Sequence, residues 1–353
     1  MKAQKVIIKP KLLLTLIITT ISIISNPVFA QESNQSMTRK AQISFFYPLG
    51  SNGMNSQSYS NKFSFNILFG LNGGLNGGIE IGGLMNLNEG EVRGFQLSGI
   101  TNVNKEQSSG LLLTGVTNIC IDSSSGVLIS GILNYTKNAS KGILLSTINV
   151  AKNEFTGFQL GVVNYAQKLR GVQLGVINVV DDGENAIPIG LINIVKNGHY
   201  EIEATAGEVL YANLNYKMGV ERFYTIFKTG YSSYRNEPVY SYGIGFGGII
   251  PIAEKHELSI DLSTNVIIYS NNWSEDWRKK TSSLHKADFN YRYTLTQKIS
   301  ILVGPSFNVY QTNEMINGEY GTLNIPYTMY KKETTESSLS MWVGFNAGLS
   351  IKL

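Results

Sequence analysis

The stretch "GFQLGVVNYAQKLRGVQLGVINVV", residues 157–180, contains nearly the same eight residues twice, Gly-x-Gln-Leu-Gly-Val-x-Asn, with a polar gap between the copies. Aligning the chain on the asparagine extends the repeat to eight copies over about residues 78–197, spaced by 16, 16, 16, 15, 15, 14 and 15 residues. A register held this closely indicates a repeat architecture. The repeated asparagines are Asn86, Asn102, Asn118, Asn134, Asn149, Asn164, Asn178 and Asn193.

Each copy holds two short apolar pieces around a small residue, and the early copies carry one extra residue between the pieces. In a continuous membrane strand that residue would turn every later side chain to the other face, whereas a corner between two short strands tolerates it. The repeats therefore predict a β-solenoid of 14–16-residue coils, with the asparagines stacked in a structural column. The alternative makes each repeat a membrane strand of one larger barrel of about 18 strands.

The chain after the repeats changes character. Long segments alternate apolar residues with polar residues or glycine, as residues 339–353 do, and tight turns alternate with longer polar loops at about 233–239, 271–283 and 313–337. This pattern is typical of an antiparallel transmembrane β-barrel. Strands are expected near residues 199–206, 209–220, 222–232, 239–252, 256–269, 284–296, 298–312 and 338–353, with two more near 41–48 and 62–70.

These patterns predict an all-β protein with a C-terminal barrel of about 8–10 strands. The expected division is a signal peptide over residues 1–30, N-terminal barrel strands in 31–77, the repeats in 78–197 and the remaining barrel strands in 198–353. On this trace the repeats would follow the second barrel strand and lie on the periplasmic side or in the lumen. The chain would end on the periplasmic side.

The first thirty residues have the three parts of a secretory signal: basic residues, an apolar run over 12–24, and the stretch "VFA" before a cleavage site after Ala30. Its removal takes away four lysines, which leaves 25 basic residues against 25 acidic ones. A balanced charge removes the main electrostatic reason to expect nucleic-acid binding. With Cys120 as the only cysteine, the chain can form no intramolecular disulfide and no thiolate metal cluster.

The copies "GFQLSGITN", "GFQLGVVN" and "GVQLGVIN" resemble the repeats of bacterial surface repeat-containing proteins, whose motif reads Gly-x-Gln-Leu-(Ala/Ser)-Gly-x-x-Asn. The copies "GILLSTIN" and "AIPIGLIN" match loosely, and "FYPLG", "RFYTIFKTGY", "SYGIGFG" and "GPSFNVY" are similar to outer-membrane proteins of that group. The resemblance implies an outer-membrane surface location and no particular activity.

No motif with a catalytic mechanism is present. His199, His256 and His285 lie far apart in the sequence, and neither His-Glu-x-x-His nor Gly-x-Ser-x-Gly occurs. We therefore expect no catalytic residue, no cofactor and no metal. The loop "NNWSEDWRKKTSS", residues 271–283, combines acids, bases and tryptophans and is expected to meet lipopolysaccharide headgroups, with ligand binding as the alternative.

The function expected from the sequence is that of a non-enzymatic outer-membrane, cell-surface barrel with a structural or interaction role. Its expected partners are outer-membrane lipid, lipopolysaccharide and, through the last strand, the barrel-assembly machinery, but no nucleic acid. A passive pore is the first alternative, because the lumen-facing positions are polar and rich in glycine. An outer-membrane enzyme that acts on lipid or peptide is the second.

Overall fold

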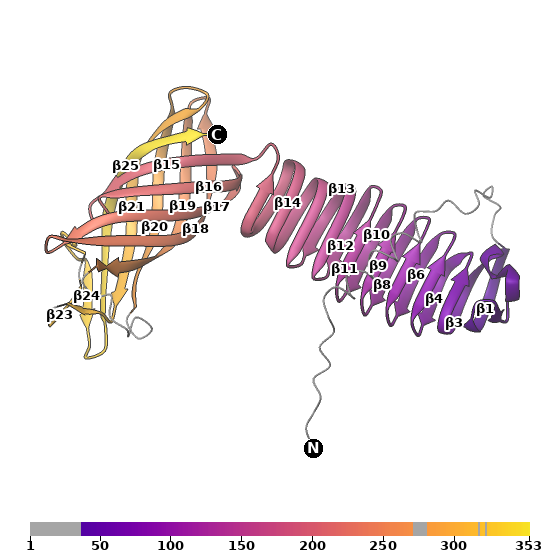
Figure 1. The fold of residues 1–353 in the computed structure, drawn as a ribbon. Coiled ribbons are helices and arrows are strands. Elements are labelled where there is room, and N and C mark those ends of the chain that lie inside the picture. The colour runs from indigo at the N-terminus through magenta and orange to yellow at the C-terminus, as the bar shows by residue number, and fades with distance from the viewer. Residues whose placement is uncertain (1–36, 271–280, 317, 322) are drawn as a thin grey trace, which may run out of the picture.

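The computed structural model describes residues 37–270, 281–316, 318–321 and 323–353, so the predicted signal peptide and most of the tryptophan-rich loop lie outside the described residues. Most of the described chain is in strands, which form a parallel β-solenoid followed by an antiparallel barrel (Figure 1). The helix among these residues is a 3-10 turn, Gly53–Ser58, and no described helix is long and apolar enough to cross a membrane. The predicted fold class is confirmed.

The solenoid pairs each copy with the next in parallel, so that equivalent residues are neighbours: Gly110 lies between Gly94 and Gly126. The coils alternate a longer and a shorter strand, and the last coils run together as continuous strands. The strands are β4 (Gly74–Gly82), β5 (Met85–Asn88), β6 (Val92–Ser98), β7 (Thr101–Asn104), β8 (Ser108–Thr114), β9 (Thr117–Cys120), β10 (Ser124–Ser130), β11 (Leu133–Thr136), β12 (Ser140–Leu145), β13 (Ile148–Leu160) and β14 (Val163–Val195).

The extra residue of the early copies lies at the corner between the longer and the shorter strand of each coil. Ile129 pairs with Leu145 and Leu133 with Ile148, so three residues connect the paired positions in the earlier coil and two in the later one. Because a corner absorbs an insertion, the copies stay in register although their lengths differ. Neighbouring strands of a membrane barrel would run antiparallel, so the alternative of one larger barrel is wrong.

The leading glycine of a copy forms a bend within the longer strand. Gly126, for example, has a φ of 127°, which residues with a side chain rarely adopt. A Cβ at this position would also meet the carbonyl oxygen of Gly110 in the coil before it. The repeated glycine is therefore required by both the backbone angle and the close approach of successive coils.

The N-terminal strands belong to the solenoid, which corrects the expectation that residues 41–48 and 62–70 are barrel strands. Strand β1 (Met37–Phe46) pairs in parallel with β3 (Tyr59–Asn72), and β3 pairs in parallel with β4 and β5. The two-residue strand β2 (Leu49–Gly50) folds back antiparallel onto β1. Alternating apolar residues suit an outward-facing coil as well as a barrel wall, so the pattern alone could not separate the two.

The barrel contains eight antiparallel strands, within the expected 8–10, and is closed by pairing between the first and the last of them. Its strands are β15 (His199–Gly207), β16 (Ala212–Val220), β17 (Phe223–Tyr234), β18 (Glu237–Ala253), β19 (His256–Tyr269), β20 (Ser282–Thr294), β21 (Ile299–Thr312) and β25 (Ser338–Lys352). The long connection before β25 contains β22 (Met315–Ile316), β23 (Glu319–Tyr320) and β24 (Tyr330–Glu333).

The solenoid precedes the whole barrel in the chain and projects from the barrel end that carries the C-terminus (Figure 1). It lies neither between the second and third barrel strands nor in the lumen, which corrects the expected placement. The connection between β14 and β15 is short, and the Tyr200 hydroxyl group spans it by bonding to both the N–H and the carbonyl of Val195 at 2.8 and 2.9 Å. The last coil is thereby held against the barrel.

Candidate functional site

The eight repeat asparagines form one fully buried column inside the solenoid. The first seven each donate from Nδ2 to Oδ1 of the asparagine in the next coil, at distances of 2.9–3.1 Å. Most also donate to a backbone carbonyl, as Asn102 does to Leu113 at 2.9 Å. An amide that is buried and bonded on both sides serves packing rather than ligand binding, because its donors and acceptor are already engaged.

The column continues beyond the predicted residues at both ends. Asn66 donates to Asn86 at 3.0 Å and accepts a hydrogen bond from Ser44 at 2.6 Å. At the other end Asn193 donates to the Thr225 hydroxyl group of barrel strand β17 at 2.9 Å. The ladder therefore runs from the N-terminal strands into the barrel wall. Asn66 was not predicted as part of the column, because it precedes Asn86 by 20 residues, outside the repeat spacing.

The first coils contain a buried carboxylate, Glu80, among amides. Its oxygens accept hydrogen bonds from Asn88 and Gln96 at 2.8 Å each, from Asn66 at 3.3 Å, and from Asn72. Burial raises the pKa of Glu80, and these hydrogen bonds only partly offset that effect. Glu80 occupies the column that glutamine fills in several other copies, which makes it an exception to a neutral interior.

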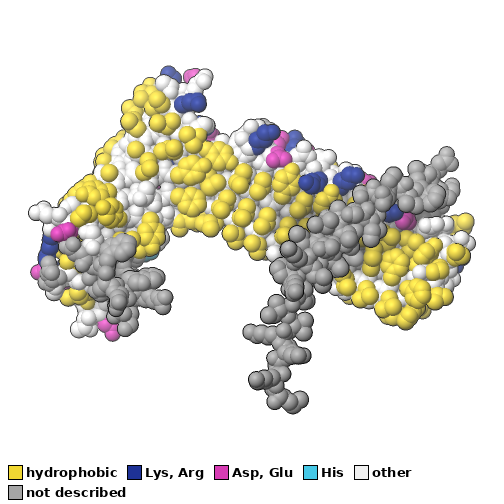
Figure 2. Space-filling view, viewed as in Figure 1, with side chains coloured by type: hydrophobic (Ala, Val, Ile, Leu, Met, Phe, Trp, Pro, Cys, Tyr) yellow, Lys and Arg dark blue, Asp and Glu magenta, His cyan; other side chains and the backbone are white. Residues whose placement is uncertain are grey.

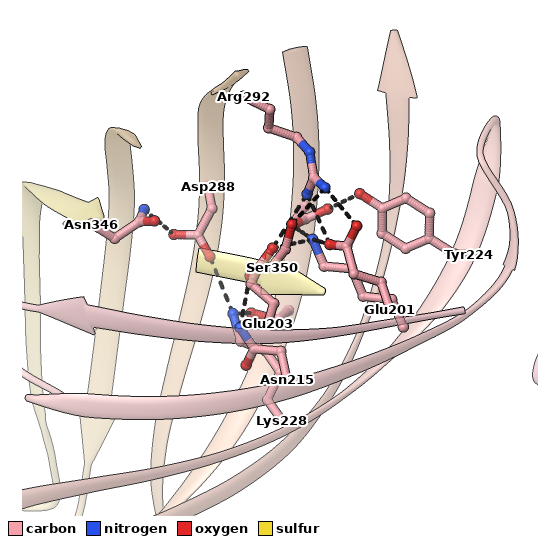
Figure 3. Close-up of polar contacts among 12 residues, drawn as sticks. Glu201, Glu203, Asn215, Tyr224, Lys228, Asp288, Arg292, Asn346 and Ser350 are labelled. Carbon is pink, nitrogen blue, oxygen red and sulfur yellow. Dashed lines mark hydrogen bonds and ion pairs between the residues drawn. The ribbon is translucent and has the colours of Figure 1, made fainter. Parts of the chain in front are cut away.

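The barrel lumen next to the solenoid is filled by a network around Lys217, of whose members Figure 3 labels Glu203, Asn215 and Tyr224. The Lys217 ammonium group lies 2.7 Å from the carboxylate of Glu203 and 2.9 Å from that of Asp261. The Tyr224 hydroxyl group donates to Asp261 at 2.6 Å, and the Asn215 amide donates to Glu203 at 2.9 Å. All five side chains are buried, and each charged group contacts one of opposite charge inside the barrel rather than facing a channel.

A second cation extends this network across the lumen. The Arg292 guanidinium group donates to Glu201 at 2.9 Å and to the Ser350 hydroxyl group at 3.0 Å (Figure 3). Further along, Lys228 lies 3.1 Å from the carboxylate of Asp288. These positions were predicted only as a polar lumen face, although the charged pairs Glu201/Glu203 and Lys286/Asp288, two residues apart within a strand, were an available signal.

The opposite end of the lumen, toward the long loops, is closed by an apolar cluster. Leu323, from the connection before β25, is fully buried among barrel side chains that include Trp342. The Trp342 indole donates to Glu208 at 2.7 Å, and the hydroxyl groups of Tyr269 and Tyr310 lie 2.7 Å apart. A barrel of eight strands is narrow enough for side chains to fill, and here they close it at two levels.

The histidines and the cysteine are not assembled into a reactive site. His199 is buried, whereas His285 Nδ1 lies 3.0 Å from the Thr264 hydroxyl group on another part of the barrel. Burial raises the pKa of the Cys120 thiol to about 12, so this group stays protonated and unreactive. Among the described residues, no three histidine, cysteine or acidic side chains are placed to hold a metal ion.

Comparisons with protein-family models, with curated proteins and with solved structures found no match to this chain. Any functional conclusion must therefore come from the arrangement of its own residues.

Proposed function

We propose that the chain is a non-enzymatic outer-membrane β-barrel with a structural or interaction role at the cell surface. The observation that carries this proposal is the difference between the outer and the inner face of the barrel wall. Large apolar side chains point outward, with Leu262, Phe345 and Leu349 each more than half exposed, while Lys217 and Arg292 are buried inside. A wall with apolar side chains outside and charged side chains inside suits a lipid environment.

The connections between strands support the proposed orientation. Those at the end that carries the C-terminus and the solenoid are short, whereas the connection from Asn313 to Ser337 at the other end is long and polar. In outer-membrane barrels the short turns are periplasmic and the long loops are external. The solenoid would then lie on the periplasmic side and the long loop would meet lipopolysaccharide. The last strand, β25, would engage the barrel-assembly machinery.

The proposed barrel is closed to passive transport. Ion pairs fill the lumen around Lys217, and an apolar cluster fills it around Trp342. We expect no ionic conductance when purified protein is added to a planar lipid bilayer. Steady ohmic conductance would favour the pore alternative.

Fractionation of cells that express the full chain tests the location. We expect the protein in the outer-membrane fraction, with faster gel migration before boiling than after, because a folded barrel resists unfolding by detergent. Recovery of the chain as a soluble periplasmic protein would refute the proposal. Cleavage of residues 313–337 by protease added to whole cells is expected if these residues form an external loop.

A further inference from the structure

The outer surface of the solenoid carries two regions of opposite character. From the bend glycine to the residue after the ladder asparagine, no outward-facing side chain is charged in any of the eight copies. The one charged residue in these segments, Glu80, points inward. The copy that begins at Gly157 shows the pattern: its outward residues are Phe158, Leu160, Val162, Val163 and Tyr165. The polar side chains among the outward residues are uncharged hydroxyl groups, those of Thr101, Thr117, Thr147 and the half-buried Ser146.

The charged residues of the repeats gather on the remaining edge, between the ladder asparagine and the next bend glycine. There they form ion pairs along and between coils, such as Lys105 with Glu89 at 2.8 Å and Arg170 with Glu154 at 3.0 Å. Figure 2 shows dark blue and magenta side chains along one edge of the solenoid and yellow ones over the visible face below it. The solenoid is therefore amphipathic along its whole length.

The uncharged region, from the bend glycine to the residue after the ladder asparagine on both sides of the corner, forms the uncharged flanks, and its apolar side chains are well exposed. Leu160 is 41% exposed, Val162 49% and Leu191 42%, and equivalent residues repeat in coil after coil. An apolar area of this extent on a protein surface marks a site of contact with a membrane or another protein. The inside of the solenoid cannot explain it, because that space is already filled by the ladder and the apolar core.

Three observations favour lipid as the occupant. The apolar area continues onto the wall of the adjoining barrel (Figure 2). The flanks lie on both sides of a corner, so that one rigid partner would cover only part of them, whereas fluid acyl chains can cover both. The backbone groups of the flanks are paired in the parallel ladders, which lowers the cost of placing them in an apolar medium.

The boundary between the two regions has the composition of a membrane interface. Tyr165 lies beside the charged edge, donates from its hydroxyl group to Asp181 at 2.8 Å, and has the Lys152 ammonium group 5.2 Å from its ring centroid. Tyr135 holds the equivalent position two coils earlier. Tyrosine is enriched where a protein passes from lipid tails to headgroups, because its ring is apolar and its hydroxyl group is polar.

We propose that the solenoid lies along the bilayer, with its uncharged flanks among the acyl chains of the leaflet nearest the short barrel turns and its charged edge in water. This inference rests on the proposed membrane location of the barrel. An amphipathic element that lies in a membrane interface buries its apolar face by about 5–10 Å, which suits flanks of this kind. The solenoid thus becomes a lipid-bound arm rather than a free periplasmic domain.

Quenching by brominated acyl chains tests this placement in the full chain. An environment-sensitive dye is attached to Val162→Cys on a flank, to Gln167→Cys on the charged edge, or to Leu262→Cys on the barrel wall. Cys120 is buried and does not compete for the label. Each protein is reconstituted in phosphatidylcholine vesicles with brominated acyl chains, and shifted gel migration before boiling verifies that the barrel is folded.

We expect quenching several-fold stronger at Val162→Cys than at Gln167→Cys, and comparable to that at Leu262→Cys. Strong quenching at Leu262→Cys with equal, weak quenching at the two solenoid positions would overturn the arm while leaving the barrel proposal intact. Absence of quenching at Leu262→Cys in folded protein would instead refute the membrane location itself. Energy transfer between copies labelled at Val162→Cys, without bromine quenching there, would mean that a second copy covers the flank, which also overturns the proposal.

Discussion

Replacing Asn164 by alanine should weaken the middle of the solenoid by about 2 kcal/mol. Its side chain accepts a hydrogen bond from Asn149 at 2.9 Å and donates to Asn178 at 3.0 Å and to the Leu174 carbonyl at 3.1 Å. The losses are unequal. Asn149 keeps its bond to the Leu160 carbonyl, and the Leu174 carbonyl keeps its backbone donor, but the Asn178 oxygen loses its ladder donor.

The expected free energy follows from these three bonds. Each net hydrogen bond contributes about 1 kcal/mol, and an unsatisfied buried acceptor costs about 1–3 kcal/mol, so about 1–3 kcal/mol brackets the change. Because coils contact only their neighbours, the loss should stay local to residues 148–180. Native-state hydrogen exchange on the folded full chain in detergent measures it, since about 2 kcal/mol corresponds to roughly 30-fold faster exchange.

Asn138→Ala is the matched control, because Asn138 is exposed and its side chain bonds only to Asp122 on the surface, at 2.7 Å. We expect the control to exchange like the unmodified protein, and the barrel strands to be unaffected in both variants. Equal protection of residues 148–180 in Asn164→Ala and in the control would show that the ladder does not stabilise the stack.

Two further changes test the interior and the bend. Glu80→Gln should remove a pH dependence from the stability of the solenoid. Because burial raises the folded pKa of Glu80, the stability of the native protein falls as pH rises from about 4.5 through that raised value, by about 1.4 kcal/mol per unit of difference. The melting temperature of Glu80→Gln minus that of the native protein should increase from pH 4 to pH 8. A difference that stays constant with pH would contradict this. Gly126→Ala should cost about 1–3 kcal/mol from its φ of 127°, whereas Ser125→Ala should change the unfolding midpoint little. Equal midpoints would contradict the bend requirement.

The solenoid could be predicted well from the sequence because individual residues mark the register of its repeats. The one-residue insertion in the early copies distinguished corners from a continuous strand, and the invariant asparagine marked the ladder position. The C-terminal barrel strands were also predictable, since alternation is a local property. Loop length was less so, because the longer loop expected at about 233–239 is a two-residue turn between β17 and β18. The strands near 41–48 and 62–70 were assigned to the barrel wrongly, because alternation predicts a strand with one apolar face but not the strand with which it pairs.

Other features depend on contacts that no local pattern encodes. Thr225 ends the ladder only because the last coil meets strand β17. The pairing of Lys217 with both Glu203 and Asp261 joins three strands that are separated in sequence. The repeat also does not state which of its faces is inside: a column of asparagine and glutamine could have faced water, and only the folded coil places it within.

The two ends of the ladder are fixed by different contacts, Ser44 with Asn66 at one and Asn193 with Thr225 at the other, while interior coils meet only coils of their own kind. Duplication or loss of one whole interior copy would therefore preserve both ends. Each such event would change the length of the stack by one strand spacing, about 4.8 Å. Copy number is thus a means by which evolution could adjust the reach of the stack in discrete steps without redesigning the barrel.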